Sequence, residues 1–491
     1  MIETSAPGLL RPDRWDGRFY SDGWRSTTGG TADVLDKSTG AVIGRIGVAS
    51  VADVAAASKR AADAFPSWAA TAPAERAAIL HRAADLLEAA AGEISPWNVR
   101  ETGGIPAKAG FEVQIAAGEL RESANLVEHE ARRIIERTAE VESIAVRVPI
   151  GVVGVITPWN MPLILAMRSV APALALGNTV VLKPDLQTAV IGGFVIAEVL
   201  EQAGLPAGVF HVVPGDAEPG AALTEDPNVS MISFTGSTAV GRLVGAAAGR
   251  SLKRVALELG GNSPFIVLDD ADLDLASSAG AFGSFFHQGQ ICMASSRHLV
   301  HERIAGAYVS KLVERAARLP VGDPSAGEVA LGPLINDEQL ARVVDIVDRT
   351  VQAGARVVTG ATHEGRFYRP TVLTGVTPDM PAFSEEIFGP VAPITTFATD
   401  EEAIALANRT EYGLSSGIYS ANVARAGAIA ARLRTGLAHV NDQTVNDDPR
   451  IPFGGFGASG NGGRFGSLSN LEEFTTWRWL TIRQRGHQYP F

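Results

Sequence analysis

Between residues 152 and 259 the sequence alternates between short apolar runs and longer segments with helical patterning. The apolar runs are rich in valine, isoleucine and leucine, so we expect each to form a strand buried on both faces. Buried strands that alternate with helices predict a doubly wound α/β fold with a parallel sheet, which binds ligands beyond the carboxyl ends of its strands. The expected strands are 152–156, 179–183, 210–213, 231–234 and 255–259.

The rest of the chain extends this pattern on both sides. A second alternating series begins at 264–268 and continues to about residue 440, with no long linker between the two series. Residues 17–47 predict small strands or a hairpin. Residues 142–149 form a strand candidate that is rich in charge, and we expect it to pair at a sheet edge or between subunits.

Three helices are expected between these two regions. Ser50 and Asp53 resemble a capping box, which marks the start of a helix. A second helix begins after Thr71 and Pro73, and a third covers roughly residues 111–137. We interpret all three as packing helices that carry no chemical residues.

The composition excludes several classes of partner. A chain of 491 residues is expected to hold roughly two to four domains. Its net charge of −12, without a run of lysine or arginine, lacks the basic footprint of nucleic-acid binding. Residues 1–15 lack the pattern of a secretory signal, and the single cysteine fits a reducing cytoplasm. The uncharged stretch 148–167 is long enough to span a membrane, but its glycines and prolines argue against a spanning helix.

The single cysteine, Cys292, is the first candidate for chemistry. Cysteine is often buried as an inert small hydrophobe, so the residue type alone favours a structural role. However, a turn containing Gly289 precedes it, which suits presentation of the thiol at the end of an element. A nucleophilic thiol also needs a base or a charge nearby, which this stretch alone does not identify.

Two polar residues lie at or just after the ends of the first two expected strands of the sheet. Asn160 lies in a turn stiffened by Pro158 and Pro162, where its amide could donate to an oxyanion or form an Asx turn. Lys183 ends the next strand before Pro184, where it could bind a sugar hydroxyl or a phosphate, or remain solvated.

Three further stretches have both a chemical and a structural interpretation. Residues 234–241 give a strand, a glycine turn and a helix start, which suits a phosphate but lacks the G-x-G-x-x-G spacing. Glu258 lies in an apolar strand before two glycines, where burial would raise its pKa toward that of a general base. Glu386 and Phe388 could hold a ribose and a ring, or only close a loop.

Together these stretches resemble the aldehyde dehydrogenase superfamily, in the family's order and over nearly the whole chain. The glycine-rich run at 452–460 matches the family as well. The resemblance implies that Cys292 is the nucleophile, Glu258 the general base and Asn160 the oxyanion donor, with no metal. It implies that the cofactor-binding residues are Ile156, Trp159, Lys183, Gly236, Ser237, Gly241, Glu386 and Phe388.

The resemblance also implies an aldehyde-dehydrogenase-like α/β fold in three parts. The first is a Rossmann-like cofactor-binding domain formed by 1–125 and 150–258. The second is an α/β catalytic domain over 259–455. The third is a small β oligomerisation arm formed by 126–149 and 470–491, which implies a homodimer or a homotetramer.

Two positions depart from the commonest family pattern. Many NAD-preferring members have a glutamate where this chain has Leu186, so we expect NAD as the cofactor with NADP also accepted. Many members have asparagine where this chain has His287. Together with the segments 167–170 and 441–446, His287 makes the chain most similar to the benzaldehyde and vanillin dehydrogenase branch.

The expected activity is therefore NAD(P)-dependent oxidation of an aromatic aldehyde to the carboxylic acid through a thiohemiacetal and a thioester on Cys292. Arg168 could meet a ring substituent or form a structural ion pair. The alternatives are an aliphatic or semialdehyde dehydrogenase, a CoA-acylating dehydrogenase, which usually lacks the acid at Glu258, a redox-free cysteine hydrolase and a non-catalytic homologue. An apolar wall for the substrate is expected from Met161, Leu165, Ile291 and Met293.

Overall fold

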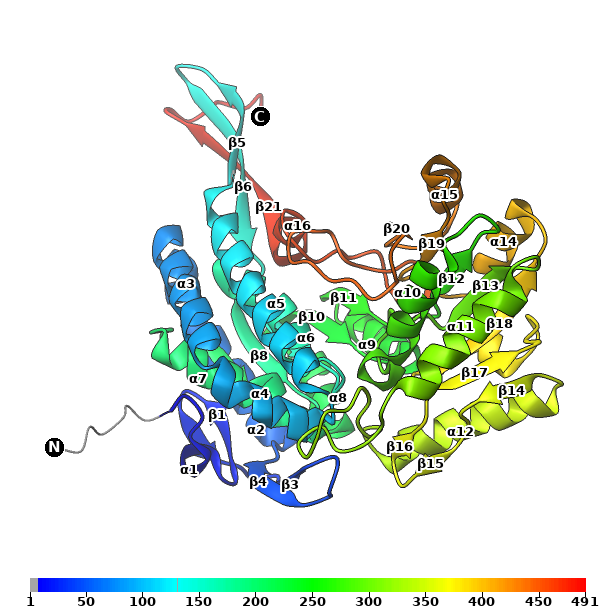
Figure 1. Ribbon diagram of the computed structural model, residues 1–491. Helices are drawn as coiled ribbons and strands as arrows, with labels where there is room; N and C mark the ends of the chain where they lie inside the picture. The colour runs from blue at the N-terminus through cyan, green and yellow to red at the C-terminus, as the bar shows by residue number, and fades with distance from the viewer. Residues whose placement is uncertain (1–7, 130) are drawn as a thin grey trace.

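The computed structural model describes residues 8–129 and 131–491 (Figure 1). Residues 1–7 of the expected cofactor-binding domain and residue 130 of the expected arm lie outside this described part. Two seven-stranded sheets form the body, and a three-stranded sheet projects from it. Two small hairpins complete the strands, β3 (Thr31–Leu35) with β4 (Val42–Gly47) and β15 (His363–Glu364) with β16 (Phe367–Tyr368).

The first seven-stranded sheet contains all five strands expected between residues 152 and 259, each within two residues of its expected bounds. These five strands are parallel, and β1 joins the edge in the antiparallel direction. Because β8 and β10 lie on opposite sides of β7, the strand order reverses there, and this is where such sheets bind ligands. The order is β11 (Arg254–Glu258), β10 (Val229–Thr235), β7 (Val152–Ile156), β8 (Thr179–Lys183), β9 (Phe210–Val212), β1 (Arg18–Ser21) and β2 (Trp24–Ser26).

The second seven-stranded sheet is formed by the later alternating series. Its strands are parallel except for β14, which pairs antiparallel with β17. The order is β14 (Arg356–Thr359), β17 (Thr371–Thr374), β18 (Val391–Phe397), β13 (Arg297–His301), β12 (Pro264–Val267), β19 (Gly417–Tyr419) and β20 (His439–Val440).

Helices cover both faces of each sheet, as a doubly wound fold requires. On the first sheet, alternate strand residues pack against two separate apolar clusters, one under α6 and the other under α2, α8 and α9. The second sheet lies between α10 with α11 on one face and the group from α12 to α15 on the other. The helices are α1 (Pro12–Trp15), α2 (Val51–Ala70), α3 (Pro73–Ala89), α4 (Ala91–Thr102), α5 (Pro106–Asn125), α6 (Pro162–Ala175), α7 (Val195–Gln202), α8 (Ala217–Glu225), α9 (Thr238–Arg250), α10 (Leu273–Phe285), α11 (Ala305–Arg318), α12 (Asp337–Gln352), α13 (Pro381–Ser384), α14 (Asp400–Ala407), α15 (Val423–Ala430) and α16 (Ser469–Phe474).

The N-terminal helices confirm one expectation and correct another. Ser50 caps α2 and forms the expected capping box with Asp53. The helix expected over 111–137 ends at Asn125, because residues 132–137 form a strand instead. Pairing with a neighbouring strand determines the conformation of residues 132–137, since their local helix propensity is only moderate.

The projecting sheet consists of β5 (Arg132–Arg137), β6 (Val141–Pro149) and β21 (Thr475–Arg483), and we call it the arm (Figure 1). Its central strand is β6, which pairs with β5 on one side and β21 on the other. The expected edge position of this strand is therefore wrong. Within the described residues, no helix is long and apolar enough to cross a membrane, and the uncharged stretch 148–167 is divided between β6, β7 and α6.

Candidate active site

A cavity of about 350 Å³ lies at the carboxyl ends of β7 and β10, where the order of the first sheet reverses. Residues from α12 and from the loop before β18 close its other side. It therefore joins the two halves of the molecule at the place where a doubly wound sheet binds its ligand. The sequence-predicted residues that line it are Trp159, Asn160, Gly236, Ser237, Cys292, Glu386 and Phe388.

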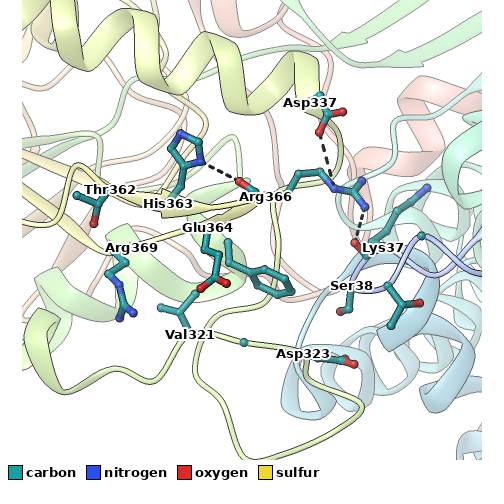
Figure 2. A pocket seen from close by; sticks show the side chains of 15 residues that line it. Lys37, Ser38, Val321, Asp323, Asp337, Thr362, His363, Glu364, Arg366 and Arg369 are labelled. Atoms are coloured by element: carbon teal, nitrogen blue, oxygen red, sulfur yellow. Dashed lines mark hydrogen bonds and ion pairs between the residues drawn. The ribbon is translucent and has the colours of Figure 1, made fainter.

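A larger, more open cleft of about 880 Å³ lies elsewhere, beside the β15–β16 hairpin (Figure 2). None of the sequence-predicted site residues lines it. Its central guanidinium, on Arg366, donates to the carbonyl oxygens of Ile335 and Lys37, at 3.0 and 2.6 Å. His363 Nδ1 lies 2.9 Å from the carbonyl oxygen of Gly365. Since these groups serve the cleft's own structure, the smaller cavity is the candidate active site.

Cys292 lies in the loop between α10 and β13, on the second sheet. The preceding residues His287 and Gln288 have left-handed backbone conformations, with φ of 49° and 57°, and Gly289 follows at 67°. Burial raises the pKa of the Cys292 thiol to about 12; the carboxylate of Glu386 adds to this effect and Arg168 opposes it. The thiol is therefore protonated near neutral pH, and attack on a substrate requires that it lose its proton.

Asn160 follows β7 and lines the cavity beside Cys292. Its Nδ2 donates to the backbone carbonyl oxygen of Gln290, with 2.9 Å between the two atoms. Because a carbonyl oxygen only accepts, this contact fixes which side of the amide carries the nitrogen. The nitrogen carries two N–H groups, so its second N–H can donate to a substrate oxygen in the cavity.

Glu258 ends β11 and is almost fully buried. Neither carboxyl oxygen has a hydrogen-bond partner within the described residues. Burial raises its pKa to about 8, while the charges of Arg168 and Arg464 act in the opposite direction. Gly454, from the late glycine-rich run, packs so close to Glu258 that a Cβ there would lie 2.9 Å from Oε1. The residue is thus a buried acid that titrates near neutral pH, as a general base requires.

Two glycines after β11 allow the functional groups to meet. A Cβ on Gly261 would overlap with the Cys292 carbonyl oxygen, and a Cβ on Gly260 would lie 2.5 Å from Glu386 Oε2. The N–H of Gly261 donates to Glu386 Oε1 at 2.8 Å. Glycine is required at position 261 because the clash there is with backbone, whereas a side chain at position 260 would displace the Glu386 carboxyl group.

The start of α9 forms one end of the cavity. Residues 235–239 line it, and the Ser237 side chain caps the helix by accepting from the N–H of Val240 at 3.4 Å. A helix N-terminus favours a negatively charged group such as a phosphate. Gly241 does not line the cavity; it lets α9 pack on Leu259, whose side chain a Cβ there would overlap.

Two further predicted residues end strands of the first sheet. Lys183 ends β8, and its Nζ donates to the Asp216 carbonyl oxygen at 3.4 Å. Burial lowers the pKa of Lys183, while the nearby carboxylate of Asp185 raises it. Ile156 is the last residue of β7 and is buried. Both residues lie at the carboxyl edge of the first sheet, but neither of them lines the cavity, and nor does Glu258.

The opposite end of the cavity is aromatic and acidic. The rings of Trp159 and Phe388 meet edge to face, with centroids 5.5 Å apart. Phe388 has a left-handed backbone with φ of 57°, and α12 holds it through Gln339, whose Nε2 donates to the Phe388 carbonyl oxygen at 2.8 Å. The cavity thus combines a helix start, charged side chains that can bind hydroxyl groups, and aromatic rings. This combination fits the nicotinamide cofactor that the resemblance implies.

The residues expected to form an apolar wall also meet. They line a second, small cavity of about 30 Å³ next to Cys292, together with Phe453. Arg168 lies at the same cavity with its guanidinium 4.0 Å from the centroid of the Phe453 ring, and it forms an ion pair with Asp447. The expected ion pair is therefore present, and Arg168 also lines the cavity.

The sequence interpretation missed the buried charges on α5. Lys108, Glu112 and Glu119 are almost fully buried on this helix, which we expected to carry no chemical residues. Glu119 lies 4.0 Å from Arg168, and burial raises its pKa to about 8. Their spacing of four and seven places them on one face together with Ala116, and this pattern was the available signal.

Comparisons with known proteins agree with this geometry. Residues 24–480 match the family described as "Aldehyde dehydrogenase family". A vanillin dehydrogenase from an Amycolatopsis species is 54% identical over 484 residues, which cover 98% of this chain and 100% of that protein. Benzaldehyde dehydrogenase [NAD(+)] from Pseudomonas putida is 51% identical over 478 residues, which cover 97% of this chain and 98% of that protein. The crystal structure of a salicylaldehyde dehydrogenase from Pseudomonas putida G7, complexed with salicylaldehyde, has a TM-score of 0.93 at 35% identity and covers 96% and 99% of the two chains.

Proposed function

Because the chain belongs to the aldehyde dehydrogenase family, we propose that it oxidises an aromatic aldehyde, of the benzaldehyde or vanillin type, to the carboxylic acid. The observation that carries this proposal is the apolar wall beside Cys292, which Met161, Leu165, Ile291 and Met293 form. Two methionines, Met161 and Met293, adapt well to the face and edge of a flat ring. The relatives named for vanillin and benzaldehyde support the same class of substrate.

In the first proposed step, the thiol proton of Cys292 passes to solvent water and the sulfur attacks the aldehyde carbon. The Asn160 amide and the backbone N–H of Cys292 hold the oxyanion of the resulting thiohemiacetal. The hydrogen bond from Asn160 to the Gln290 carbonyl oxygen supports this role because it orients the amide before substrate binds. A preorganised donor of this kind stabilises the developing charge at no further cost.

In the second proposed step, the thiohemiacetal carbon is oxidised to a thioester. Bound between the α9 start and the Trp159–Phe388 pair, NAD would supply the hydride acceptor. Glu258 then takes a proton from a water molecule, which attacks the thioester carbon and releases the carboxylic acid from Cys292. Its pKa of about 8 suits this transfer near neutral pH.

We propose NAD as the main cofactor, with NADP accepted. Leu186 begins the short helix Leu186–Thr188, three residues after Lys183. It offers no carboxylate to bind the adenosine ribose hydroxyls or to repel a 2′-phosphate. The relative named benzaldehyde dehydrogenase [NAD(+)] supports NAD as the main cofactor.

We also propose the three-part division into a cofactor-binding domain, a catalytic domain and an arm that joins copies of this chain as a homodimer or homotetramer. Exposed apolar side chains on the arm support the last point: the side chain of Trp479 is 76% exposed, and Ile135 is 62% exposed. Large apolar groups left in water are typical of association surfaces. The single cysteine supports a cytoplasmic location.

An initial-rate panel of aromatic and aliphatic aldehydes with both nicotinamide cofactors tests the proposal. We expect kcat/KM for benzaldehyde and vanillin to exceed that for short aliphatic aldehydes by about tenfold or more, since this ratio measures specificity. A higher value for an aliphatic aldehyde would overturn the aromatic assignment. The same assays with CoA present distinguish the acylating alternative, because hydrolysis gives the free acid and acylation gives the CoA thioester.

A further inference from the structure

A buried ion pair on α5 lies behind the candidate active site, and we propose that it positions the Asn160 amide. Lys108 and Glu112 lie one turn apart on α5, and both are fully buried. Lys108 Nζ contacts Glu112 Oε1 and also donates to Asn98 Oδ1 and Thr102 Oγ1, at 3.1 and 3.2 Å. These contacts fix the Glu112 carboxyl group in one orientation. The inference rests on the proposed oxyanion role of Asn160.

The second carboxyl oxygen of Glu112 holds the start of α6. Oε2 accepts from the N–H of Leu163 at 2.9 Å and from the N–H of Ile164 at 3.4 Å. These are the first N–H groups of the helix, because α6 begins with Pro162, which has none. A carboxylate at a helix N-terminus is favoured by the helix dipole. Glu112 therefore fixes the backbone three and four residues after Asn160.

The Asn160 side chain is held from the opposite side. Its Nδ2 donates to the Gln290 carbonyl oxygen, and Gln290 Oε1 in turn accepts from the N–H of Ile335 at 3.0 Å. The neighbouring Gln288 Nε2 donates to the Pro333 carbonyl oxygen at 2.8 Å. The oxyanion amide thus has one anchor on the thiol loop and a second, through Glu112, on the α6 start.

Stability alone does not account for this pair. Burying two charges costs more free energy than the attraction between them commonly returns, and apolar residues of the same volume are often at least as stable. A carboxyl oxygen that accepts from two backbone N–H groups gives directional control that apolar packing does not. Displacing a catalytic group by about 1 Å can lower a rate by about 100-fold, so control of the α6 start bears directly on the reaction.

The loop that carries the thiol also lies near this pair. A Cβ placed on Gly104 would lie 2.9 Å from Lys108 Cδ and 3.2 Å from His287 Nδ1, so the two side chains share one small space. Neither ring nitrogen of His287 has a hydrogen-bond partner within the described residues. The positive charge of Lys108 lies near this ring and, after burial, is the second cause that lowers the pKa of His287.

A double-mutant cycle tests whether Glu112 acts through Asn160. The readout is the single-turnover rate constant for formation of reduced cofactor, which isolates the step that the oxyanion amide assists. We expect Asn160→Ala to lower this constant by about 100-fold or more, as loss of one oxyanion donor does. Glu112→Leu should lower it about 10-fold or more in the wild-type background and have no further effect beside Asn160→Ala. Equal losses in both backgrounds, or a wild-type constant in Glu112→Leu, would overturn the inference.

A second variant guards against misfolding of Glu112→Leu. The pair Lys108→Met with Glu112→Gln removes both charges but keeps an amide oxygen that can accept from the α6 start. We expect this double variant to keep a rate constant within about threefold of wild type, because the directional contact remains. A loss as large as that of Glu112→Leu, with the Cys292 thiol still alkylated stoichiometrically, would show that the acceptor is not what matters.

Glu101→Gln is the matched control. Glu101 is also a buried carboxylate that accepts from two successive N–H groups, those of Val190 and Ile191, at 3.0 and 2.8 Å. That contact lies at another helical segment, so we expect lower stability with an unchanged rate constant. An equal loss of rate in this control would overturn the specific role of Glu112. Failure of the wild type to oxidise any aldehyde would instead refute the proposed function, and this inference with it.

Discussion

The two seven-stranded sheets have similar architectures but position the residues of the candidate active site in different ways. The first sheet places its functional residues at or directly after strand ends: Lys183 ends β8, Glu258 ends β11, and Gly236 follows β10. The second sheet places Cys292 and Glu386 in irregular loops, before β13 and before β18.

The difference lies in what fixes each position. On the first sheet, the hydrogen-bond register of parallel strands sets where a strand ends. On the second, left-handed residues such as His287 and Phe388, together with the close approach of Gly261 to the Cys292 carbonyl, set the loops. Strained backbone persists only where surrounding packing determines it. We therefore expect changes in the loops of the second sheet to affect the chemistry most.

The largest expected effect divides the reaction between the two sheets. Cys292→Ser should lower dehydrogenation by about 10⁴-fold or more, since no thioester can form. Glu258→Gln should still give a burst of reduced cofactor, followed by steady-state turnover slower by about 100-fold or more, because only hydrolysis needs this base. Rapid mixing with absorbance detection separates the burst from the steady state. Full steady-state activity in Glu258→Gln would contradict the assignment.

The next effect concerns the protonation of the thiol. Burial raises the pKa of Cys292 to about 12, so its thiolate fraction should still be rising well above pH 9. Alkylation by iodoacetamide should accelerate about tenfold per pH unit between about pH 7 and 10, because only the thiolate reacts. A small exposed thiol, run in parallel, should level off near its pKa of about 8.5. A plateau for Cys292 in the same range would show that the loop lowers the pKa instead.

Cofactor choice belongs to the first sheet and should respond more modestly. Leu186→Glu should shift the ratio of kcat/KM for NAD to that for NADP by about 10- to 100-fold toward NAD, or about 1–3 kcal/mol. The added carboxylate would accept from ribose hydroxyls and repel a 2′-phosphate. Leu186→Gln is the control, because it adds an acceptor of similar size without charge. No shift in Leu186→Glu would place cofactor discrimination at another residue.

The smallest expected effect is on stability. Glu258 has a folded-state pKa of about 8, above its ordinary value of 4.5, so the folded state favours the neutral acid. The contribution of the neutral Glu258 side chain to the free energy of unfolding is complete at pH values below 4.5 and is lost as the pH rises through about 8. The gain in Tm from Glu258→Gln should therefore be small near pH 5, grow to roughly 2–5 °C near pH 8, and then remain constant. Calorimetry at one fixed protein concentration measures the change in Tm. A gain in Tm that shrinks with rising pH would contradict a raised pKa for Glu258.

The same contrast explains what the sequence could predict. The strands of the first sheet were expected within two residues because fully buried, β-branched runs bounded by turns have few other uses. Asn160 and Gly236 were placed beside the cavity because such residues follow strand ends. The contact between Gly261 and Glu386, by contrast, joins segments 125 positions apart and has no local signature.

Two errors have the same origin. The helix expected to reach residue 137 ends at Asn125, because β5 gains a partner in β6 that helix propensity cannot report. The buried charges of Lys108 and Glu112 were overlooked because their surroundings come from α6 and the thiol loop. In each case a segment outside the stretch itself decides the structure.

The arm also has a consequence for the order in which the chain is made. Its central strand β6 can pair with β5 at once, but its other edge waits for β21. The side chains of Arg147 on β6 and Thr475 on β21, which form a hydrogen bond, are 328 positions apart. At about 5–20 residues per second, the ribosome needs on the order of half a minute to supply the missing strand. During that time the nascent arm exposes an unpaired strand edge, which is the kind of edge that other chains can join. Completion of the arm thus waits until β21 has been made.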